Sequence, residues 1–162
     1  MDDQHAKLKV LSKQQAQLKA KNFCAYQERA QQEVRNKIYE WGLHSNDVEQ
    51  IITALIEENF LNEERFSCTY ALGKFRIKNW GKIKIRHGLR LKKISDKLIL
   101  KALGKIDDDD YIHTLELILK KKSKLILEKD PYKKDFKLMQ YALSKGFEKD
   151  LILDVLKNSD LS

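Results

Sequence analysis

Apolar residues recur at helical spacing along most of the chain. Val34, Ile38 and Trp41 stand at positions i, i+4 and i+7, and Gly42 follows where helices commonly stop. Gly occurs six times and Pro only once, a composition that argues against a turn-rich all-β fold. The pattern therefore predicts an all-α protein with about nine helices.

Residues suited to helix starts precede several of the apolar stretches. Ser12 with Gln15, and Asn46 with Glu49, have the spacing of a capping box, in which two side chains satisfy backbone N–H groups. The acidic run 107–110 suits a helix N-terminus, because the helix dipole favours negative charge there. Further N-cap candidates are Asn62, Ser95 and Asp130, the last followed by Pro131.

Residues 82–86 alternate apolar and basic side chains, which also fits a strand, but the neighbouring segments favour a helix there.

The same helical periodicity predicts which side chains face the core. The expected core positions are Ala16, Ala20, Phe23 and Cys24; Val48, Ile51, Ile52, Leu55 and Ile56; Phe66, Tyr70 and Ile77; Ile83, Ile85 and Leu89; Leu98, Ala102 and Leu103; Leu115, Ile118, Leu119 and Leu125; Phe136, Met139 and Leu143; and Leu151, Val155 and Leu156.

Three residue pairs mark a weak internal repeat. Gly42-Leu43, Lys93-Ile94 and Gly146-Phe147 each precede a short helical apolar stretch, at intervals of 51 and 53 residues. Such periods are typical of proteins that stack small helical units. We therefore expect three tandem three-helix repeats stacked into an elongated, curved array. They span residues 1–60, with an N-terminal extension, residues 61–105 and residues 106–162.

Positive charge is concentrated in the expected second repeat. Residues 66–105 hold twelve basic residues against Asp96 alone, a net +11, so the rest of the chain carries −3 of the total +8. This concentration favours an anionic partner such as nucleic acid, a nucleoprotein or an acidic protein face. The alternative is a solvated lysine-rich face, although such faces usually mix both signs.

Known catalytic and metal-binding patterns are missing from the sequence. Its Gly-Lys pairs lack the remainder of a phosphate-binding loop, and its four histidines have no metal-ligand spacing. The run 107–110 lacks the alternation and the glycine of a calcium loop. We expect a protein that is not an enzyme, with no cofactor and no catalytic, metal-binding or cofactor-binding residue.

Several features indicate a cytoplasmic protein. Cys24 and Cys68 form no CxxC pattern and are expected to be reduced core or near-core residues. No run of 18 or more apolar residues is present, so we expect no transmembrane helix and no membrane partner. Residues 1–5 lack an apolar signal core. We expect a monomer in the cytoplasm.

The segment from Gly73 to Ile85 carries the most information about function. It interleaves lysine and arginine with Phe75 and Trp80 around the Gly81 break. Basic residues beside aromatic ones can hold a phosphate backbone and stack on bases. The alternative is that both aromatic residues anchor a helix junction in the core while the basic residues face solvent.

Here the sequence resembles the RecX regulatory proteins of bacteria. Residues 60–67 resemble the family's aromatic-Leu-Asn-Asp-x-x-Phe-Ala junction, with Glu63 at the usual Asp and Ser67 at the usual Ala. Residues 73–94 resemble its basic helix, glycine and short helix, with Lys93 at the usual glycine. Gly146-Phe147 and the stretch to Leu156 match its closing helix, so the resemblance covers about residues 12–156.

This resemblance implies a regulator of the recombinase RecA. Family members are built from three three-helix repeats and bind RecA and RecA–single-stranded DNA filaments along the helical groove. They usually inhibit ATP hydrolysis, filament growth and strand exchange in recombination, DNA repair and the SOS response, and some also bind DNA directly. From the charge clustering, the residues expected to make the electrostatic contact are Lys74, Arg76, Lys78, Lys82, Lys84, Arg86 and Arg90.

Two other functions stay open at this point. A stand-alone basic helical module that binds nucleic acid without a protein target would show the same charge pattern. An enzyme would need a polar site assembled from distant residues. A further hypothesis is that the acidic run 107–110 folds back on the basic repeat as a self-inhibitory contact.

Overall fold

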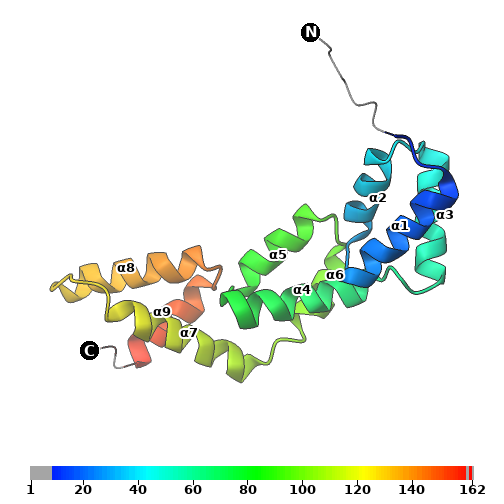
Figure 1. The fold of residues 1–162 in the computed structure, drawn as a ribbon. Coiled ribbons are helices and arrows are strands. Elements are labelled where there is room, and N and C mark those ends of the chain that lie inside the picture. Colours follow the sequence, from blue (N-terminus) through cyan, green and yellow to red (C-terminus); the bar gives the residue numbers. More distant parts are fainter. Residues whose placement is uncertain (1–8, 160, 162) are drawn as a thin grey trace, which may run out of the picture. The chain divides into compact units, whose positions relative to one another are not determined.

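The computed structural model describes residues 9–159 and residue 161 of the chain. In this part the regular elements are nine α-helices without any strand, which confirms the all-α prediction (Figure 1). They are α1 (Lys13–Tyr26), α2 (Gln31–Glu40), α3 (Ser45–Glu57), α4 (Glu63–Lys78), α5 (Lys82–Leu91), α6 (Asp96–Leu103), α7 (Asp108–Ser123), α8 (Pro131–Ser144) and α9 (Lys149–Asn158). Residues 82–86 begin α5, so the helical interpretation of that segment is correct.

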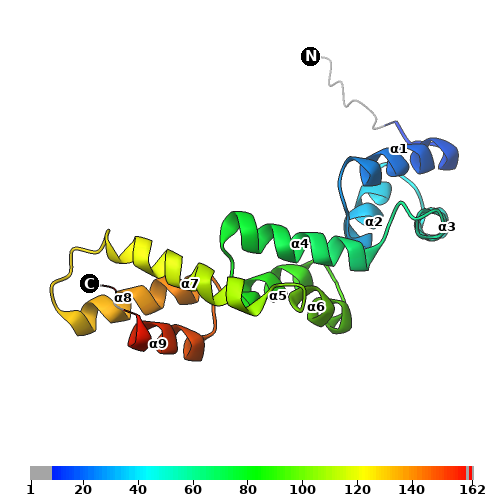
Figure 2. The same ribbon diagram turned by 90° about the horizontal axis from the view of Figure 1, so that it is seen from below.

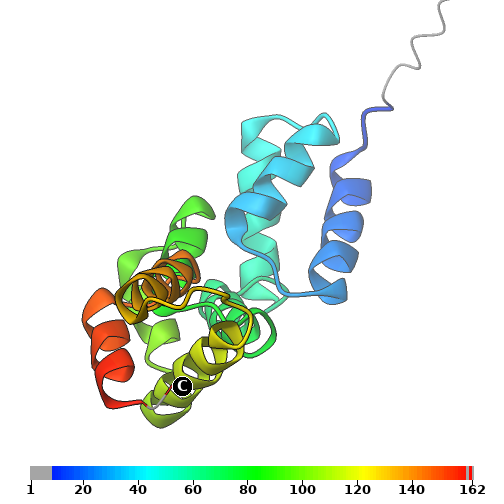
Figure 3. The same ribbon diagram turned by 90° about the vertical axis from the view of Figure 1, so that its left-hand side faces the viewer.

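The chain forms two compact units, residues 1–66 and residues 67–162, and the division falls within α4. In the first unit α1, α2 and α3 all pack against one another, and Figure 3 shows them side by side. The predicted Ser12–Gln15 capping box is present at the start of α1, with N–H to oxygen distances of 3.0 and 3.2 Å. The core of this unit is made mainly of Ala16, Ala20, Cys24, Val34, Ile38, Leu43, Val48, Ile51, Ile52, Leu55 and Leu61.

The second expected capping box is wrong. Helix α3 begins at Ser45 with His44 as its N-cap, so Asn46 already lies inside the helix. The carboxylate of Glu49 instead accepts two hydrogen bonds from Arg35 of α2, over 2.6 Å from Nε and 3.2 Å from Nη2. The Glu49 side chain, which the local pattern assigned to the start of α3, therefore forms an ion pair with another helix instead.

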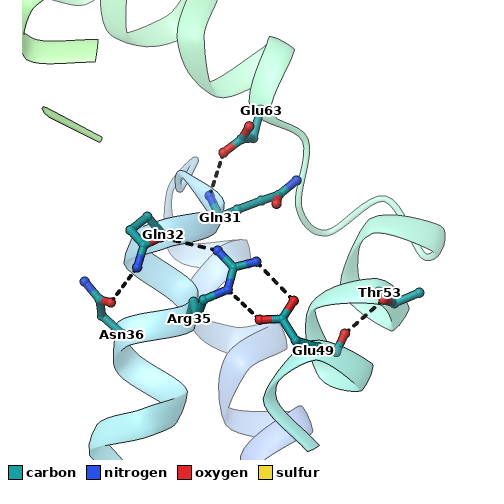
Figure 4. A network of polar contacts seen from close by, with 7 residues as sticks. All are labelled: Gln31, Gln32, Arg35, Asn36, Glu49, Thr53 and Glu63. Atoms are coloured by element: carbon teal, nitrogen blue, oxygen red, sulfur yellow. Dashed lines mark hydrogen bonds and ion pairs between the residues drawn. The ribbon is translucent and has the colours of Figure 1, made fainter. Parts of the chain in front are cut away.

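Arg35 and Glu49 lie in a polar network that ties α2 to α3 (Figure 4). The guanidinium also donates to Gln32, and the start of α2 is held separately, because the Gln31 N–H donates to Glu63 over 3.1 Å. The hydrogen bond from Arg35 lowers the pKa of Glu49 from its ordinary value. Since Glu49 is about half exposed, solvent screens this pair strongly.

The Arg35→Gln variant is expected to lower the free energy of unfolding by only about 0.5 kcal/mol at neutral pH. Because the folded-state pKa of Glu49 is depressed, the contribution of the pair is present above the unfolded-state pKa. It is lost as the pH falls through the folded-state value. Urea unfolding at neutral pH and in mild acid measures this, with Lys37→Gln, at an exposed pair on the same helix, as the control. A loss that does not change with pH would contradict the assignment.

The second unit contains two groups of helices (Figure 2). Helices α5 and α6 pack on each other after the long α4, and α7, α8 and α9 pack mutually. Ile85, Leu89 and Ile99 are fully or almost fully buried in the first group. Leu115, Leu119, Leu138, Phe147 and Ile152 are fully buried in the second group.

The three steps of the internal repeat share one backbone conformation. Gly42, Lys93 and Gly146 have φ angles of 89°, 62° and 93°, in the left-handed region. The residue after each one is buried. Each step thus ends a helix with a reversed turn and turns the next side chain into the core. Lys93 adopts this conformation without being glycine, at a cost of order 1 kcal/mol.

Several expected core residues are exposed, which corrects the predicted faces. Ile77 is 78% exposed, because the buried row of α4 runs through Ser67, Ala71 and Phe75. A residue two positions after Phe75 points to the opposite side of the helix. Phe136 is 58% exposed for the same reason, since Leu138 and Ala142 form the buried row of α8. The other exposed positions are Ile56, Ile83 and Leu125.

Candidate nucleic-acid interface

The seven basic residues chosen from the sequence lie on two helices of the second unit but not on one face. Lys74 and Lys78 of α4 are four residues apart and share a face, whereas Arg76 between them points to the opposite side. On α5, Lys82, Arg86 and Arg90 follow one another at four-residue spacing, and Lys84 lies on the other side. The structure therefore separates the set into smaller groups.

Trp80 gathers two of these lysines. The ammonium nitrogens of Lys74 and Lys84 each lie 4.8 Å from the centre of the Trp80 ring, at the distance of a cation–π contact. Phe75, in contrast, is 5% exposed and packs toward Tyr111. The core interpretation is thus correct for Phe75, while Trp80 is half-buried and holds basic side chains in place.

The turn between α8 and α9 lies directly against the start of α5. The Gly81 N–H donates to the carbonyl of Lys145 over 2.7 Å, and the Ile83 N–H donates to the carbonyl of Gly146 over 3.0 Å. These bonds satisfy N–H groups at the first turn of α5 that have no partner within the helix. The main chains meet so closely that a Cβ atom on Gly81 would lie 2.3 Å from the Gly146 carbonyl carbon.

Lys145 of this turn lies beside Lys78 and Lys84, and the sequence analysis did not identify it as a candidate site residue. Its ammonium donates to the backbone carbonyl of Lys78 over 2.9 Å, and the ammonium of Lys84 donates to the carbonyl of Ser144 over 3.4 Å. Burial, followed by the charges of Lys84 and Lys78, lowers the pKa of Lys145. The glycine stop at Gly146 was visible in the sequence, but no local pattern places it beside residues more than 60 positions earlier.

Tyr111 also stabilises the junction at which the start of α5 meets the turn between α8 and α9. Its ring is buried, with the Phe147 ring 5.0 Å away. Its hydroxyl accepts the Lys82 N–H over 2.9 Å and donates to the Glu148 carboxylate over 2.6 Å. Burial, and then the hydrogen bond to Glu148, raises the pKa of Tyr111, so the hydroxyl stays protonated as a donor.

The acidic run contacts the basic repeat at one point. Asp107 caps α7 by accepting the Asp110 N–H over 2.9 Å, which confirms the expected role of this run at a helix N-terminus. Asp108 lies 3.4 Å from the Lys82 ammonium, although its own side chain is 90% exposed. The Lys82 ammonium also lies 4.7 Å from the centre of the Tyr111 ring. Lys82 is therefore partly neutralised within the chain.

The remaining arginines differ in their surroundings. Arg90 is paired with Asp96 over 3.2 Å, and both side chains are mostly exposed. Arg76 is exposed and Arg86 is half-buried. Among residues 9–159 and 161, neither has an acidic partner within 4 Å. These two side chains can pair with an external anion without first breaking an ion pair.

The part of the chain that the structure describes contains no cluster of three metal-ligating side chains, and no helix there is both long and apolar enough to cross a membrane. His44 precedes α3 as its N-cap, and His87 and His113 are exposed, whereas His5 lies outside the described residues. Cys24 is buried and Cys68 half-buried, both as free thiols, and burial raises the pKa of Cys24 to about 11.

Comparison with known proteins places these features in one family. Residues 62–103 match the second three-helix domain of RecX, and residues 97–156 match the third. The regulatory protein RecX of Clostridium botulinum strain Alaska E43 is 33% identical over 159 residues, which cover 94% of this chain and 74% of that protein. RecX of Clostridium perfringens strain SM101 is 30% identical over 80% of this chain, which spans 61% of that relative's length.

Solved structures show the same fold. The crystal structure of RecX from Lactobacillus salivarius superposes with a TM-score of 0.85 at 24% identity, covering 93% of this chain and 97% of that one. A second crystal structure of a regulatory protein RecX gives a TM-score of 0.75 at 21% identity, over 91% of this chain and 74% of the other. By its domain matches and by its similarity to a curated relative over 74% of that relative's length, the chain belongs to the RecX family.

Proposed function

We propose that this chain is a non-enzymatic regulator of a RecA recombinase. It binds RecA and RecA–single-stranded DNA filaments as a monomer in the cytoplasm, and it inhibits ATP hydrolysis, filament growth and strand exchange. Membership of the RecX family is the observation that carries the proposal, because the curated relatives are named regulatory proteins. In this proposal the three repeats of the chain span residues 1–60, 61–105 and 106–162, and the middle repeat makes the electrostatic contact with the filament.

The charge of the middle repeat supports an anionic partner. Residues 66–105 carry a net +11, with Asp96 as the only acidic residue in this stretch. The carboxylates that pair with Lys82 and Arg90, those of Asp108 and Asp96, are largely exposed, so solvent screens both pairs and external phosphates can replace these carboxylates. A nucleoprotein filament offers such phosphates in a continuous row.

The triple variant Lys82→Gln, Lys84→Gln, Arg86→Gln tests the contact. Neutral glutamine is preferable to charge reversal, because a carboxylate at position 82 would repel Asp108. We expect filament binding at moderate salt to weaken by about tenfold or more, since three charge contacts are lost. Inhibition of DNA-dependent ATP hydrolysis by RecA should shift to correspondingly higher protein concentrations.

The matched control neutralises three exposed lysines of the third repeat, Lys120, Lys129 and Lys133. It removes the same total charge and should leave filament binding nearly unchanged. Equal binding by the parent and the middle-repeat variant would overturn the assignment of these residues. A parent protein that leaves RecA activity unchanged at every ratio would overturn the proposed function itself.

A stand-alone nucleic-acid module is the second candidate, favoured by Arg76 and Arg86, which have no acidic partner among the described residues. Binding to bare DNA should then weaken steeply with salt, as counterions are displaced from phosphates. Binding to a filament should persist to higher salt, because apolar protein contacts add to it. Tight binding to bare DNA without any effect on RecA would favour this candidate.

A further inference from the structure

Three lysines lie close together where the second and third repeats meet, since the charges of Lys84 and Lys78 both act on Lys145. Lys78 ends α4, Lys84 belongs to α5, and Lys145 lies in the turn between α8 and α9. Within the described residues, none of the three has a carboxylate within 4 Å. Such a cluster of like charges is unfavourable in the free protein and is relieved by an anion.

Two of the three ammonium groups, those of Lys84 and Lys145, are held in position before any ligand arrives. Lys145 donates to the Lys78 carbonyl over 2.9 Å, and Lys84 donates to the Ser144 carbonyl over 3.4 Å. Lys84 also lies over the Trp80 ring, together with Lys74. Each ammonium has three donors, so one bond to a carbonyl leaves donors available for a ligand. A ligand that binds here therefore needs to order few side chains.

Further basic residues lie next to the end of α4, where Asn79 follows Lys78. A groove there is lined by Asn79, Lys121, Lys122 and Tyr141, together with the apolar side chains of Ile118 and Leu125. The Lys122 ammonium lies 4.9 Å from the centre of the Tyr141 ring. None of the described residues that line this groove is acidic. The surroundings of the three lysines thus also favour an anion that carries more than one charge.

We propose that Lys78, Lys84 and Lys145 form a phosphate-binding site at the junction of the second and third repeats. Lysine ammoniums bind phosphate as point charges with several donors. The phosphate belongs either to a nucleic-acid strand or to a free nucleotide. Because the cations come from both repeats, the bound phosphate bridges them and stabilises the junction. The site needs no recombinase, so its test is independent of the proposed function.

The experiment uses Trp80 as the reporter. In a Trp41→Phe background Trp80 is the sole tryptophan, and its ring lies against Lys84 of the proposed site and against the neighbouring Lys74. Sodium phosphate is titrated against sodium chloride at equal ionic strength, while Trp80 fluorescence and the thermal unfolding midpoint are recorded. We expect phosphate alone to give a saturable fluorescence change and a rise in the midpoint.

Variants then locate the site. Lys145→Gln should weaken phosphate binding by about fivefold, the effect of one nearby charge, and Lys145→Arg should retain it. The control Lys149→Gln removes an exposed charge from the start of α9 and should bind as the parent does. Near-ultraviolet circular dichroism confirms that each variant is folded, and Lys84→Gln serves as the second test should Lys145→Gln unfold.

Competition distinguishes the two sources of phosphate. Displacement by oligothymidylate at lower concentrations than ADP assigns the site to a nucleic-acid strand, and the reverse order assigns it to a free nucleotide. Equal responses to phosphate and chloride would overturn the proposal. Equal phosphate affinity of the parent, Lys145→Gln and Lys84→Gln would overturn it as well. If the site binds phosphate and RecA is unaffected, only the proposed function fails.

Discussion

Replacing Gly81 by alanine is expected to lower the free energy of unfolding of the second unit by about 3 kcal/mol or more. The added Cβ would lie 2.3 Å from the carbonyl carbon and oxygen of Gly146 and 2.4 Å from the Phe147 nitrogen. All three are main-chain atoms, so no side-chain rotation relieves the overlap. The start of α5 must move away, and the hydrogen bonds of Gly81 and Ile83 to the α8–α9 turn are lost.

Urea unfolding followed by circular dichroism measures this loss, and Gly73→Ala is the matched control. Gly73 lies inside α4, and a Cβ atom there would meet nothing within 4 Å. The control should therefore gain about 0.5–1 kcal/mol, because alanine restricts the unfolded chain and favours a helix. A Gly81→Ala protein as stable as the parent would show that the two repeats are not packed as closely as described.

The helices themselves were predictable because their signals are local. Ser12, Asn62 and Ser95 each accept a backbone N–H at the start of a helix, as the sequence indicates. The repeat spacing aligned Gly42, Lys93 and Gly146, and the structure gives all three a left-handed conformation, although the sequence offered no glycine to predict it at Lys93. Caps and turns depend on residues within a few positions of each other, so one sequence is sufficient to find them.

Side-chain direction was less predictable than helix position. In α4 the apolar residues Phe75 and Ile77 both suggest a core position, but they lie about 200° apart around the helix axis. Only the packing of the folded unit selects Phe75, which is buried, over Ile77, which is exposed. An apolar pattern with two candidate faces therefore leaves the choice to contacts that are distant in sequence.

The basic character of the candidate site was predictable, whereas its composition was not. Lys74, Lys78 and Lys84 were chosen from charge clustering alone, but nothing in the sequence connects them with Lys145. That connection depends on Gly81 and Gly146 meeting across the junction. The carbonyl contacts of Lys145 and Lys84 follow from this meeting. The site therefore arises from the packing of two repeats, each of which carries only part of it.

The Tyr111→Phe variant is expected to lower the free energy of unfolding by about 2 kcal/mol. Removal of the hydroxyl leaves the Lys82 N–H without its acceptor and the half-buried Glu148 carboxylate without its donor. The aromatic packing on Phe147 remains, so the loss reports the polar contacts alone. Thermal or urea unfolding at neutral pH measures it, and Tyr132→Phe, at a tyrosine that is 88% exposed, should change stability by less than about 0.5 kcal/mol.

The pH dependence of this difference provides a second readout. The pKa of Tyr111 is raised in the folded protein, so the contribution of its protonated hydroxyl is complete below the unfolded-state pKa of about 10. It is lost as the pH rises through the folded-state value. The stability difference between parent and variant should therefore shrink in alkaline solution. There the unfolded parent ionises its Tyr111 hydroxyl, which the folded parent keeps protonated, and the variant has no hydroxyl at this position. A difference that stays constant above pH 10 would mean that the hydroxyl is already accessible to water, and the junction would then be more open than its hydrogen bonds indicate.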